Sequence, residues 1–204
     1  MTDNTSNNND FSCSLIIPTR DNYAYLKSCI DSILESSNSE KLDIIIIDNS
    51  SEEQATLNYL DSLRRTKNFQ VLSWPNHFNY SAINNFAARA AKSEVLCFLN
   101  NDVVITDKEW LPKTLPLVKR QDVGAVGCVL LYPDSTIQHA GIALDEQSIG
   151  KHIALNEESK FLENHGISDP FAVDCSTAAF LLTKRELFFK LGGFNEAKLS
   201  IAYN

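Results

Sequence analysis

The sequence predicts an α/β fold: an open, mostly parallel sheet with helices on both faces. Short apolar runs typical of strands alternate with stretches of helical spacing between residues 13 and 99. The second run contains four consecutive isoleucines, as expected for a parallel strand that is buried on both faces. Three of the runs end in polar residues, and a parallel sheet places such ends at one edge.

The pattern of the first hundred residues defines each element in turn. Apolar spacing after the first run predicts a helix with Asp21 or Asn22 as its cap. In chain order, the predicted elements are a strand at 13–19, a helix ending at Glu35, a strand at 41–51, a helix at 52–65 preceded by Ser51, a strand at 69–74, an alanine-rich helix at 81–92 and a strand from 94 to 99.

The second half has a looser pattern. Its predicted elements are a helix at 108–120 interrupted by Pro112 and Pro116, a strand at 123–132, a turn and strand at 134–144, an irregular stretch at 145–170, a strand at 172–183 and a short helix at 184–191 capped by Thr183 and closed by Gly192 and Gly193. Residues 1–11, rich in asparagine, serine and aspartate, predict a disordered leader. Residues 12–204 then form one domain.

Charge and composition exclude several classes of protein. A net charge of −8 over 204 residues argues against binding to a nucleic-acid backbone. No run approaches the ~20 apolar residues that span a bilayer, and the first residues do not form a signal peptide. Because the cysteines form no CxxC pair, they are interpreted as reduced core residues of a cytoplasmic protein. They are Cys13, Cys29, Cys97, Cys128 and Cys175.

The polar strand ends are the strongest functional signal that the residues give by themselves. They are Thr19-Arg20-Asp21, Asp48-Asn49-Ser50 and Asn100-Asn101-Asp102. Each one alone is explained by turn formation or helix capping, because asparagine, aspartate and serine favour both. Three such ends at the same edge of one sheet indicate a ligand site.

The missing motifs narrow the chemistry of that ligand. The chain has neither the GxGxxG of a dinucleotide cradle nor the GxxxxGK[ST] of a P-loop, which leaves a carboxylate with a divalent cation for a nucleotide diphosphate. Asp102 would supply the carboxylate for Mg²⁺ or Mn²⁺. Asn100 and Asn101 would offer amide oxygens to the metal, the ribose or sugar hydroxyls, and Asp48 would accept hydrogen bonds from a base or ribose.

Four segments together resemble family 2 glycosyltransferases of the Rossmann-like GT-A fold: SLIIPTRDN, IIIIDNSS, FNYSAINNFAARAAKSEVLCFLNND, and the stretch from WLPK to IQHAG. The likeness covers residues 13 to 196 and is closest to a bacterial subgroup that assembles O-antigen, rhamnan and other surface polysaccharides. It implies a nucleotide-diphosphate sugar donor and inverting transfer to a glycan or lipid-linked glycan. Residues 12–105 would be the nucleotide-binding half and 106–204 a partial half for sugar and acceptor.

The resemblance also implies roles for individual residues. The base would be lined by Pro18, Thr19 and Arg20, with Asp21 beside them, and the base or ribose would be bound by Asp48, with Ser50 nearby. The stretch that packs against the donor would contain Asn79, Tyr80 and Asn85. The sugar pocket would be lined by Thr177 and Ala178. Asp102 is the metal ligand of the family's DXD motif, whose first aspartate is Asn100 here, so weaker metal binding is expected. His139 and His152 match subgroup histidines to which the sequence assigns no role.

The catalytic base of the family follows the GGFNE motif, so it is expected beyond Asn204 and no catalytic residue is assigned. The alternative is therefore a non-catalytic nucleotide-sugar-binding fragment. A nucleotidyltransferase is a third interpretation, but it would have a glycine-rich basic loop after the first strand. Apolar surface left uncovered on the acceptor side would favour self-association, and peripheral attachment to the inner membrane is left open.

Overall fold

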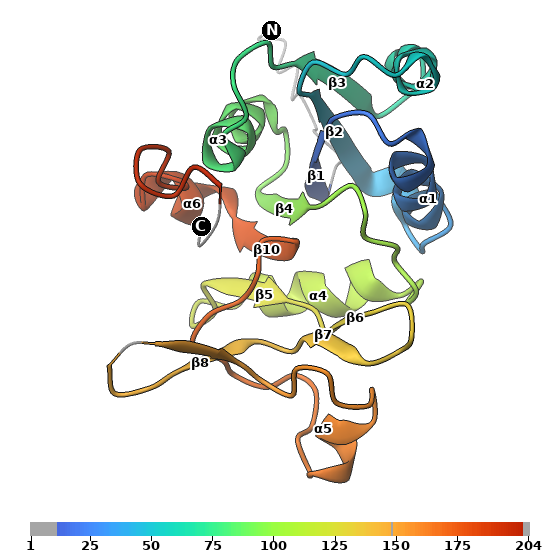
Figure 1. The fold of residues 1–204 in the computed structure, drawn as a ribbon. Helices are drawn as coiled ribbons and strands as arrows, with labels where there is room; N and C mark the ends of the chain where they lie inside the picture. Colours follow the sequence, from blue (N-terminus) through green and yellow to red (C-terminus); the bar gives the residue numbers. More distant parts are fainter. Residues whose placement is uncertain (1–11, 148, 202–204) are drawn as a thin grey trace, which may run out of the picture.

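A computed structural model describes residues 12–147 and 149–201 (Figure 1). Six strands form the central sheet in the order β3-β2-β1-β4-β10-β5. The first four strands of the chain are parallel, and β10 is antiparallel to both β4 and β5. Their bounds are β1 Cys13–Thr19, β2 Leu42–Asp48, β3 Phe69–Ser73, β4 Val95–Leu99, β5 Ala125–Gly127 and β10 Phe180–Lys184. The predicted mostly parallel sheet is confirmed, while the predicted leader at 1–11 lies outside the described residues.

Helices cover both faces of this sheet (Figure 1). The chain moves outward from β1 to β3 and then returns to the other side of β1 to form β4. Right-handed crossovers therefore place the returning helix on the opposite face, and β1 and β4 flank the switch point. On one face lie α1 Tyr23–Leu34, α2 Gln54–Arg64 and α4 Trp110–Val118, and on the other α3 Tyr80–Ala90 and α6 Arg185–Lys190.

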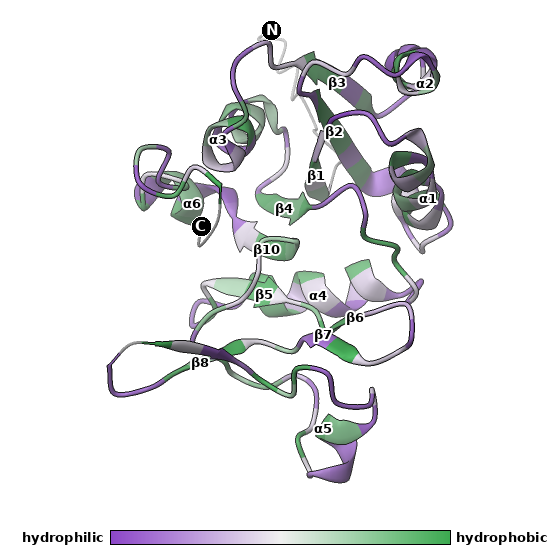
Figure 2. Ribbon diagram, in the orientation of Figure 1, coloured by the Kyte–Doolittle hydropathy of each residue, from purple (hydrophilic) through white to green (hydrophobic). Residues whose placement is uncertain are grey.

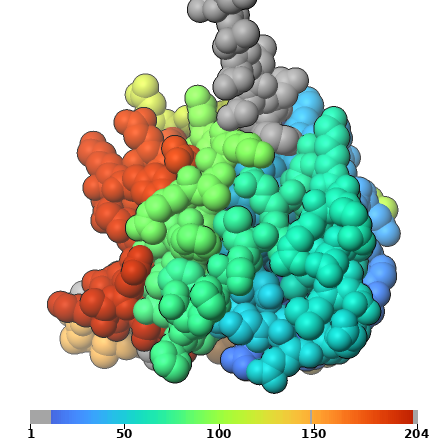
Figure 3. Space-filling model, turned by 90° about the horizontal axis from the view of Figure 1, so that it is seen from above, coloured from blue at the N-terminus to red at the C-terminus, as the bar shows by residue number. Residues whose placement is uncertain are grey.

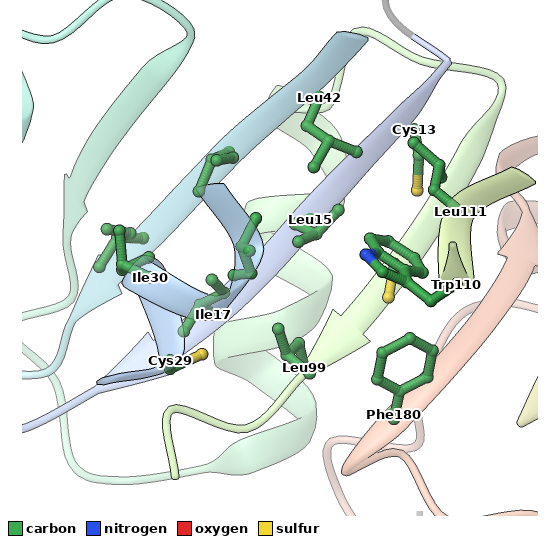
Figure 4. Packing of buried hydrophobic residues seen from close by; sticks show 14 of the residues in the cluster. Cys13, Leu15, Ile17, Cys29, Ile30, Leu42, Leu99, Trp110, Leu111 and Phe180 are labelled. Atoms are coloured by element: carbon green, nitrogen blue, oxygen red, sulfur yellow. The ribbon is translucent and has the colours of Figure 1, made fainter. Parts of the chain in front are cut away.

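The core consists of two hydrophobic layers divided by the sheet. In Figure 2 most of β2 and all of β4 carry the green of hydrophobic residues. All seven residues of β2 are buried. Ile44 and Ile46 pack in one layer and Ile45 and Ile47 in the other, which confirms the burial of this strand on both faces. In the first layer Trp110 meets Phe180 edge to face at 5.3 Å between ring centroids (Figure 4).

A smaller region lies beyond β5 and consists of short elements (Figure 1). It contains two two-stranded sheets and a one-turn helix: β6 Leu130–Leu131 with β7 Ile137–His139, β8 Ile142–Leu144 with β9 Gly150–His152, and α5 Phe161–Asn164. Ile137, Ala140 and Leu162 form its own small core. A short 3-10 helix, η1 Ser39–Lys41, precedes β2. Among residues 12–147 and 149–201, no helix has both the length and the apolar character needed to cross a bilayer.

Several strands predicted for the second half are wrong in extent. The stretch 123–132 divides into β5 and β6, which belong to different sheets, and 134–144 divides at Gly141, whose φ is +99°. Only the last part of 172–183 is a strand, and the stretch 145–170 contains β9 and α5. Two or three residues of strand carry too little periodicity to be distinguished within a longer apolar run.

Helix boundaries also differ from the prediction. Pro112 and Pro116 do not interrupt α4, because Pro112 lies in the first turn, where the N–H has no helical partner, and burial of Trp110 and Leu111 stabilises the helix. Thr183 does not cap α6. It belongs to β10 and its hydroxyl donates to the carbonyl oxygen of Gly124 at 2.9 Å. The predicted glycine stop of α6 is confirmed by positive φ at positions 192 and 193.

Candidate functional site

The three polar strand ends lie side by side at the carboxyl edge of the sheet. Thr19 pairs with Asp48 in the register of β1 and β2. The backbone N–H of Asn49 donates to the carbonyl of Thr19 at 2.8 Å, and the Nδ2 of Asn101 donates to the Thr19 hydroxyl at 2.9 Å. Thr19, the end of the strand between β2 and β4, therefore connects the other two ends.

A cleft of about 340 Å³ opens at this edge. Of the residues implied by the resemblance, it is lined by Pro18, Thr19, Arg20, Tyr80, Asn100, Asn101 and Asp102. It is also lined by Asn22, Tyr25, Asn49, Phe78 and Ile83, which the sequence analysis does not select. The side chains of Tyr25 and Phe78 are 60% and 51% exposed, so the mouth of the cleft has two uncovered aromatic rings.

Asn49 has a polar atom that lacks a partner within the described part of the chain. The residue is only 4% exposed. Its Nδ2 donates to the carbonyls of Trp74 and Asn76 at 3.2 and 3.1 Å, which fixes the orientation of the amide, while its buried Oδ1 has no hydrogen bond. A buried acceptor without a donor is costly, so this oxygen is suited to an N–H or O–H group of a ligand. In the sequence, the position of Asn49 between Asp48 and Ser50, in the middle of a polar strand end, is the feature that could have identified it as a site residue.

Asp21 does not line the cleft, because its carboxylate caps a different helix. Its Oδ1 accepts from the backbone N–H groups of Glu53 and Glu52 at 2.8 and 2.7 Å, just before α2. Those bonds hold the pKa of Asp21 below its usual value. The carboxylate of Glu53 in turn accepts from the N–H of Tyr23, the first residue of α1. The predicted capping of α1 by Asp21 or Asn22 is therefore wrong, since the two loops exchange caps.

Asp48 and Ser50 shape the turn after β2. Asp48 is 8% exposed, and its Oδ1 accepts from the N–H of Ser51 at 2.9 Å. Ser50 has a φ of 57°, and its hydroxyl lies 3.4 Å from the carbonyl oxygen of Trp74. Both residues support the backbone around Asn49 rather than line the cleft itself.

Tyr80 connects two walls of the cleft. Its hydroxyl oxygen lies 3.0 Å from the carbonyl oxygen of Ala178 and 3.3 Å from the Oδ1 of Asn100. Burial raises the pKa of Tyr80, so the hydroxyl remains a donor at neutral pH. The segment that contains Thr177 and Ala178 thus contacts the cleft wall, although neither of their side chains lines it.

The donor set next to Asp102 fits a divalent cation that is shared with a ligand. Within the described residues, no three histidine, cysteine, aspartate or glutamate side chains are grouped as a metal site. Asp102 is the one carboxylate among the described lining residues, and the amides of Asn100 and Asn101 are its neighbours. Mg²⁺ and Mn²⁺ are commonly bound by one or two carboxylates, with phosphate oxygens completing the shell. This edge therefore suits a cation that arrives with a diphosphate.

Cys29 lies beneath the same strand end. Its thiol is 3.7 Å from the carbonyl oxygen of Asn100, and burial together with the charge of Asp102 raises its pKa to about 12. Cys29 is therefore a neutral core group, as predicted. Cys13 and Cys97 are also buried, but Cys128 is half-buried and Cys175 is exposed, so the core interpretation is wrong for Cys175.

His139 supports the backbone before β10. It is 2% exposed, and its Nε2 accepts from the N–H of Thr177 at 3.3 Å. The proton of the neutral ring then lies on Nδ1, which is 3.3 Å from the Nδ1 of His152. Burial and, to a lesser extent, His152 lower the pKa of His139 to about 4. His139 is thus a neutral ring that accepts from the backbone of Thr177 and positions it.

Asn79 and Asn85 are turned away from the cleft. Asn79 caps α3, with its Oδ1 accepting from the N–H of Ala82 at 2.9 Å. Its Nδ2 donates to the carbonyl of Glu196 at 3.0 Å, and the side chain of Asn85 contacts the same segment. The α3 residues that line the cleft are Tyr80 and Ile83.

Two known proteins have sequences similar to this chain. The O-antigen biosynthesis protein RfbC of Myxococcus xanthus is 34% identical over 190 residues, covering 90% of this chain and 14% of that protein. The O-antigen chain rhamnosyltransferase WbaN of Salmonella anatum is 30% identical over 154 residues, covering 75% of this chain and 46% of that protein. The chain therefore spans less than half the length of these relatives.

A solved structure and a family model complete the comparison. The mannosyltransferase PcManGT from Pyrobaculum calidifontis, in complex with GDP-Man and Mn²⁺, superposes with a TM-score of 0.67 at 18% identity, over 93% of this chain and 49% of that one. The model of glycosyl transferase family 2 matches residues 14–186. This chain therefore belongs to glycosyl transferase family 2 and has the GT-A fold.

Proposed function

We propose that the cleft binds a nucleotide-diphosphate sugar with Mg²⁺ or Mn²⁺. In the intact protein the sugar is transferred, with inversion, to a glycan or lipid-linked glycan during surface-polysaccharide assembly, in the cytoplasm or at the inner membrane. One observation carries the proposal: the unpartnered acceptor of Asn49 and the carboxylate of Asp102 line the same cleft at the switch point of the sheet. The O-antigen names of the two relatives support the pathway class.

The β2 side of the cleft is assigned to the base. The Oδ1 of Asn49 accepts an N–H of the base, which satisfies the buried oxygen. Pro18, Thr19 and Arg20 line the base, and the exposed rings of Tyr25 and Phe78 offer flat apolar surface at the mouth. Asp21, Asp48 and Ser50 hold this end in shape through their backbone contacts.

The β4 side is assigned to the diphosphate and the sugar. Asp102 holds the cation together with the amide oxygens near it, and a bound cation stabilises charge on the departing diphosphate. The complex of PcManGT with GDP-Man and Mn²⁺ supports this assignment. Tyr80, Asn100 and the backbone of Thr177 and Ala178 then border the sugar.

A second candidate function is donor binding without transfer. Asp102 is the one acidic residue among those that line the described cleft, and it is already assigned to the cation. No second carboxylate is present there to deprotonate an acceptor hydroxyl. On this reading the chain is a nucleotide-sugar-binding module that does not itself transfer the sugar.

A thermal-shift screen of UDP, GDP, dTDP and their sugars, with and without Mn²⁺, tests the proposal. A ligand that binds only the folded chain raises its melting temperature, and the increase should be larger when Mn²⁺ is present. Mass spectrometry for released sugar or transferred product then separates the two candidates. An unchanged melting temperature across the whole panel would contradict both of them.

A further inference from the structure

Helix α3 faces the cleft on one side and the segment after α6, residues 194–200, on the other. Tyr80 and Ile83 line the cleft, whereas Asn79, Ser81 and Asn85 contact the segment. Figure 3 shows the red carboxyl-terminal part of the chain lying directly against the green atoms of α3. The first turns of α3 thus lie between the candidate site and a segment about 100 residues later in the chain.

Asn85 is the centre of this contact, and every polar atom of its side chain has a partner. Its Oδ1 accepts from the N–H of Phe194 at 2.9 Å. Its Nδ2 donates to the carbonyl oxygen of Phe194 at 2.9 Å and to the carboxylate of Glu196 at 2.8 Å. Asn85 itself is 5% exposed, so its two bonds to the backbone of Phe194 are largely buried, whereas Glu196 is exposed and its bond to Asn85 lies at the surface.

Three further bonds extend the contact along the segment. The Nδ2 of Asn79 donates to the carbonyl of Glu196 at 3.0 Å. The hydroxyl of Ser81 donates to the carbonyl of Leu199, and the N–H of Tyr80 donates to the carbonyl of Ser200 at 2.6 Å. The amino-terminal turn of α3, whose N–H groups lack helical partners, is thus partly satisfied by this segment.

Gly193 permits the close approach. Its φ is +74°, and a Cβ at this position would lie 2.6 Å from the Oδ1 of Asn85. A larger residue would be strained in its backbone and would displace the amide. The second glycine of the stop that ends α6 therefore also makes room for Asn85.

The contact reaches the cleft through two aromatic rings. The ring of Phe194 lies 6.3 Å from that of Tyr80 and 4.7 Å from that of Phe98, between centroids. Tyr80 in turn contacts Asn100 and Ala178 on the side assigned to the sugar. Packed side chains therefore lead continuously from Asn85 through Phe194 to the cleft wall.

We propose that Asn85 is a positioning residue of the site: it seats residues 193–200 on α3 and thereby orients Phe194 and Tyr80, without contacting the donor. This inference replaces the direct donor contact that the resemblance implied, and it rests on the proposed function for the identity of the ligand. It follows that donor binding and the docking of the segment stabilise each other, because both depend on the orientation of Tyr80.

Amide hydrogen exchange across residues 194–200, measured on the full chain without ligand, is the first test. Asn85→Asp removes the donor to Glu196 and places two carboxylates together, so exchange should become roughly tenfold to a hundredfold faster. Adding Glu196→Gln to this variant restores a donor and an acceptor, and should recover at least half of the lost protection on a logarithmic scale. Asn58→Asp, on the exposed face of α2, is the matched control and should change nothing there.

The second test adds UDP, GDP or dTDP with Mn²⁺. In the unmodified chain, the diphosphate that binds should slow amide exchange in residues 194–200 at least threefold. In Asn85→Asp this slowing should be absent, although calorimetry should give an affinity for the same diphosphate within about threefold of that of the unmodified chain. Unchanged exchange in Asn85→Asp, failure of Glu196→Gln to restore protection, or equal slowing by ligand in both proteins would overturn the proposal. If no diphosphate binds the unmodified chain, the proposed function fails, while the ligand-free exchange and its rescue still decide the role of Asn85.

Discussion

The strands β1, β2 and β4 bury nearly every side chain, whereas the strands β6, β8 and β9 leave most of theirs exposed. The first group is covered by helices on both faces. The second belongs to the smaller region, whose core is built around Ile137, Ala140 and Leu162. The cleft is lined by residues at the ends of β1, β2 and β4 and on the helices and loops that flank them, and none of its described lining residues belongs to the smaller region. The comparison indicates that the site's polar groups are held by the most densely buried strands of the described chain, and well-packed supports suit a binding site.

Truncating one side chain in each region tests this difference most strongly. Ile45→Ala empties a fully buried position between the sheet and α3, and should lower the free energy of unfolding by about 2–5 kcal/mol. Leu144→Ala removes a side chain that is 44% exposed, and should cost less than about 1 kcal/mol. Urea unfolding followed by circular dichroism measures both. Equal losses would mean that the smaller region is packed as tightly as the sheet.

Acid should weaken the smaller region first, through His139. Its pKa is about 4 in the folded chain against an ordinary 6.5, so the folded state favours the neutral ring. The stabilising contribution is therefore complete above pH 6.5 and is lost as the pH falls toward 4, because a proton on Nε2 would face the N–H of Thr177. We expect a loss of roughly 1–3 kcal/mol over this range. Unfolding measured from pH 7 to pH 4 should show a shallower slope in His139→Gln than in the unmodified chain, and parallel slopes would refute the assignment.

Removing the carboxylate of the cleft should weaken ligand binding without affecting the fold. Asp102→Asn keeps the size of the side chain but removes the charge for the cation, so Mn²⁺-dependent affinity for a nucleoside diphosphate should fall by about 2 kcal/mol, or thirtyfold. Asp107→Asn, a few residues further along and paired with Lys113, makes the same change outside the cleft and serves as control. If calorimetry gives an unchanged affinity for Asp102→Asn, the proposal that Asp102 binds the cation is contradicted.

The base end should contribute less. Asn49→Ala removes the acceptor but also frees the carbonyls of Trp74 and Asn76, and should weaken nucleotide binding by about 1–2 kcal/mol. The loss should be the same with and without Mn²⁺, since Asn49 belongs to the other end of the cleft. A loss that disappears when Mn²⁺ is omitted would place Asn49 at the metal end instead.

Much of the fold can be predicted from the sequence alone, because the strands and helices of the first hundred residues are long enough to show their hydrophobic periodicity. Four isoleucines in β2, alternating between two hydrophobic layers, suffice to predict a parallel strand buried on both faces. The polar ends of β1, β2 and β4 meet at one edge of the sheet because parallel strands place their carboxyl ends together. The family also follows from the residues, through motifs spread over most of the chain.

Only the tertiary structure decided which polar groups face the cleft. Asp21 is directed to α2, Asn85 to residues 194–196, and Asn49 rather than Asp48 has the unpartnered acceptor. Likewise, residues 123–132 divide between two sheets because β5 pairs with β10, from a distant part of the chain, whereas β6 pairs with β7, which follows it closely in the sequence. Sequence spacing determines where a side chain can point along its own element. Hydrogen-bond partners about 25 to 110 residues away determine which of these side chains remains available to a ligand.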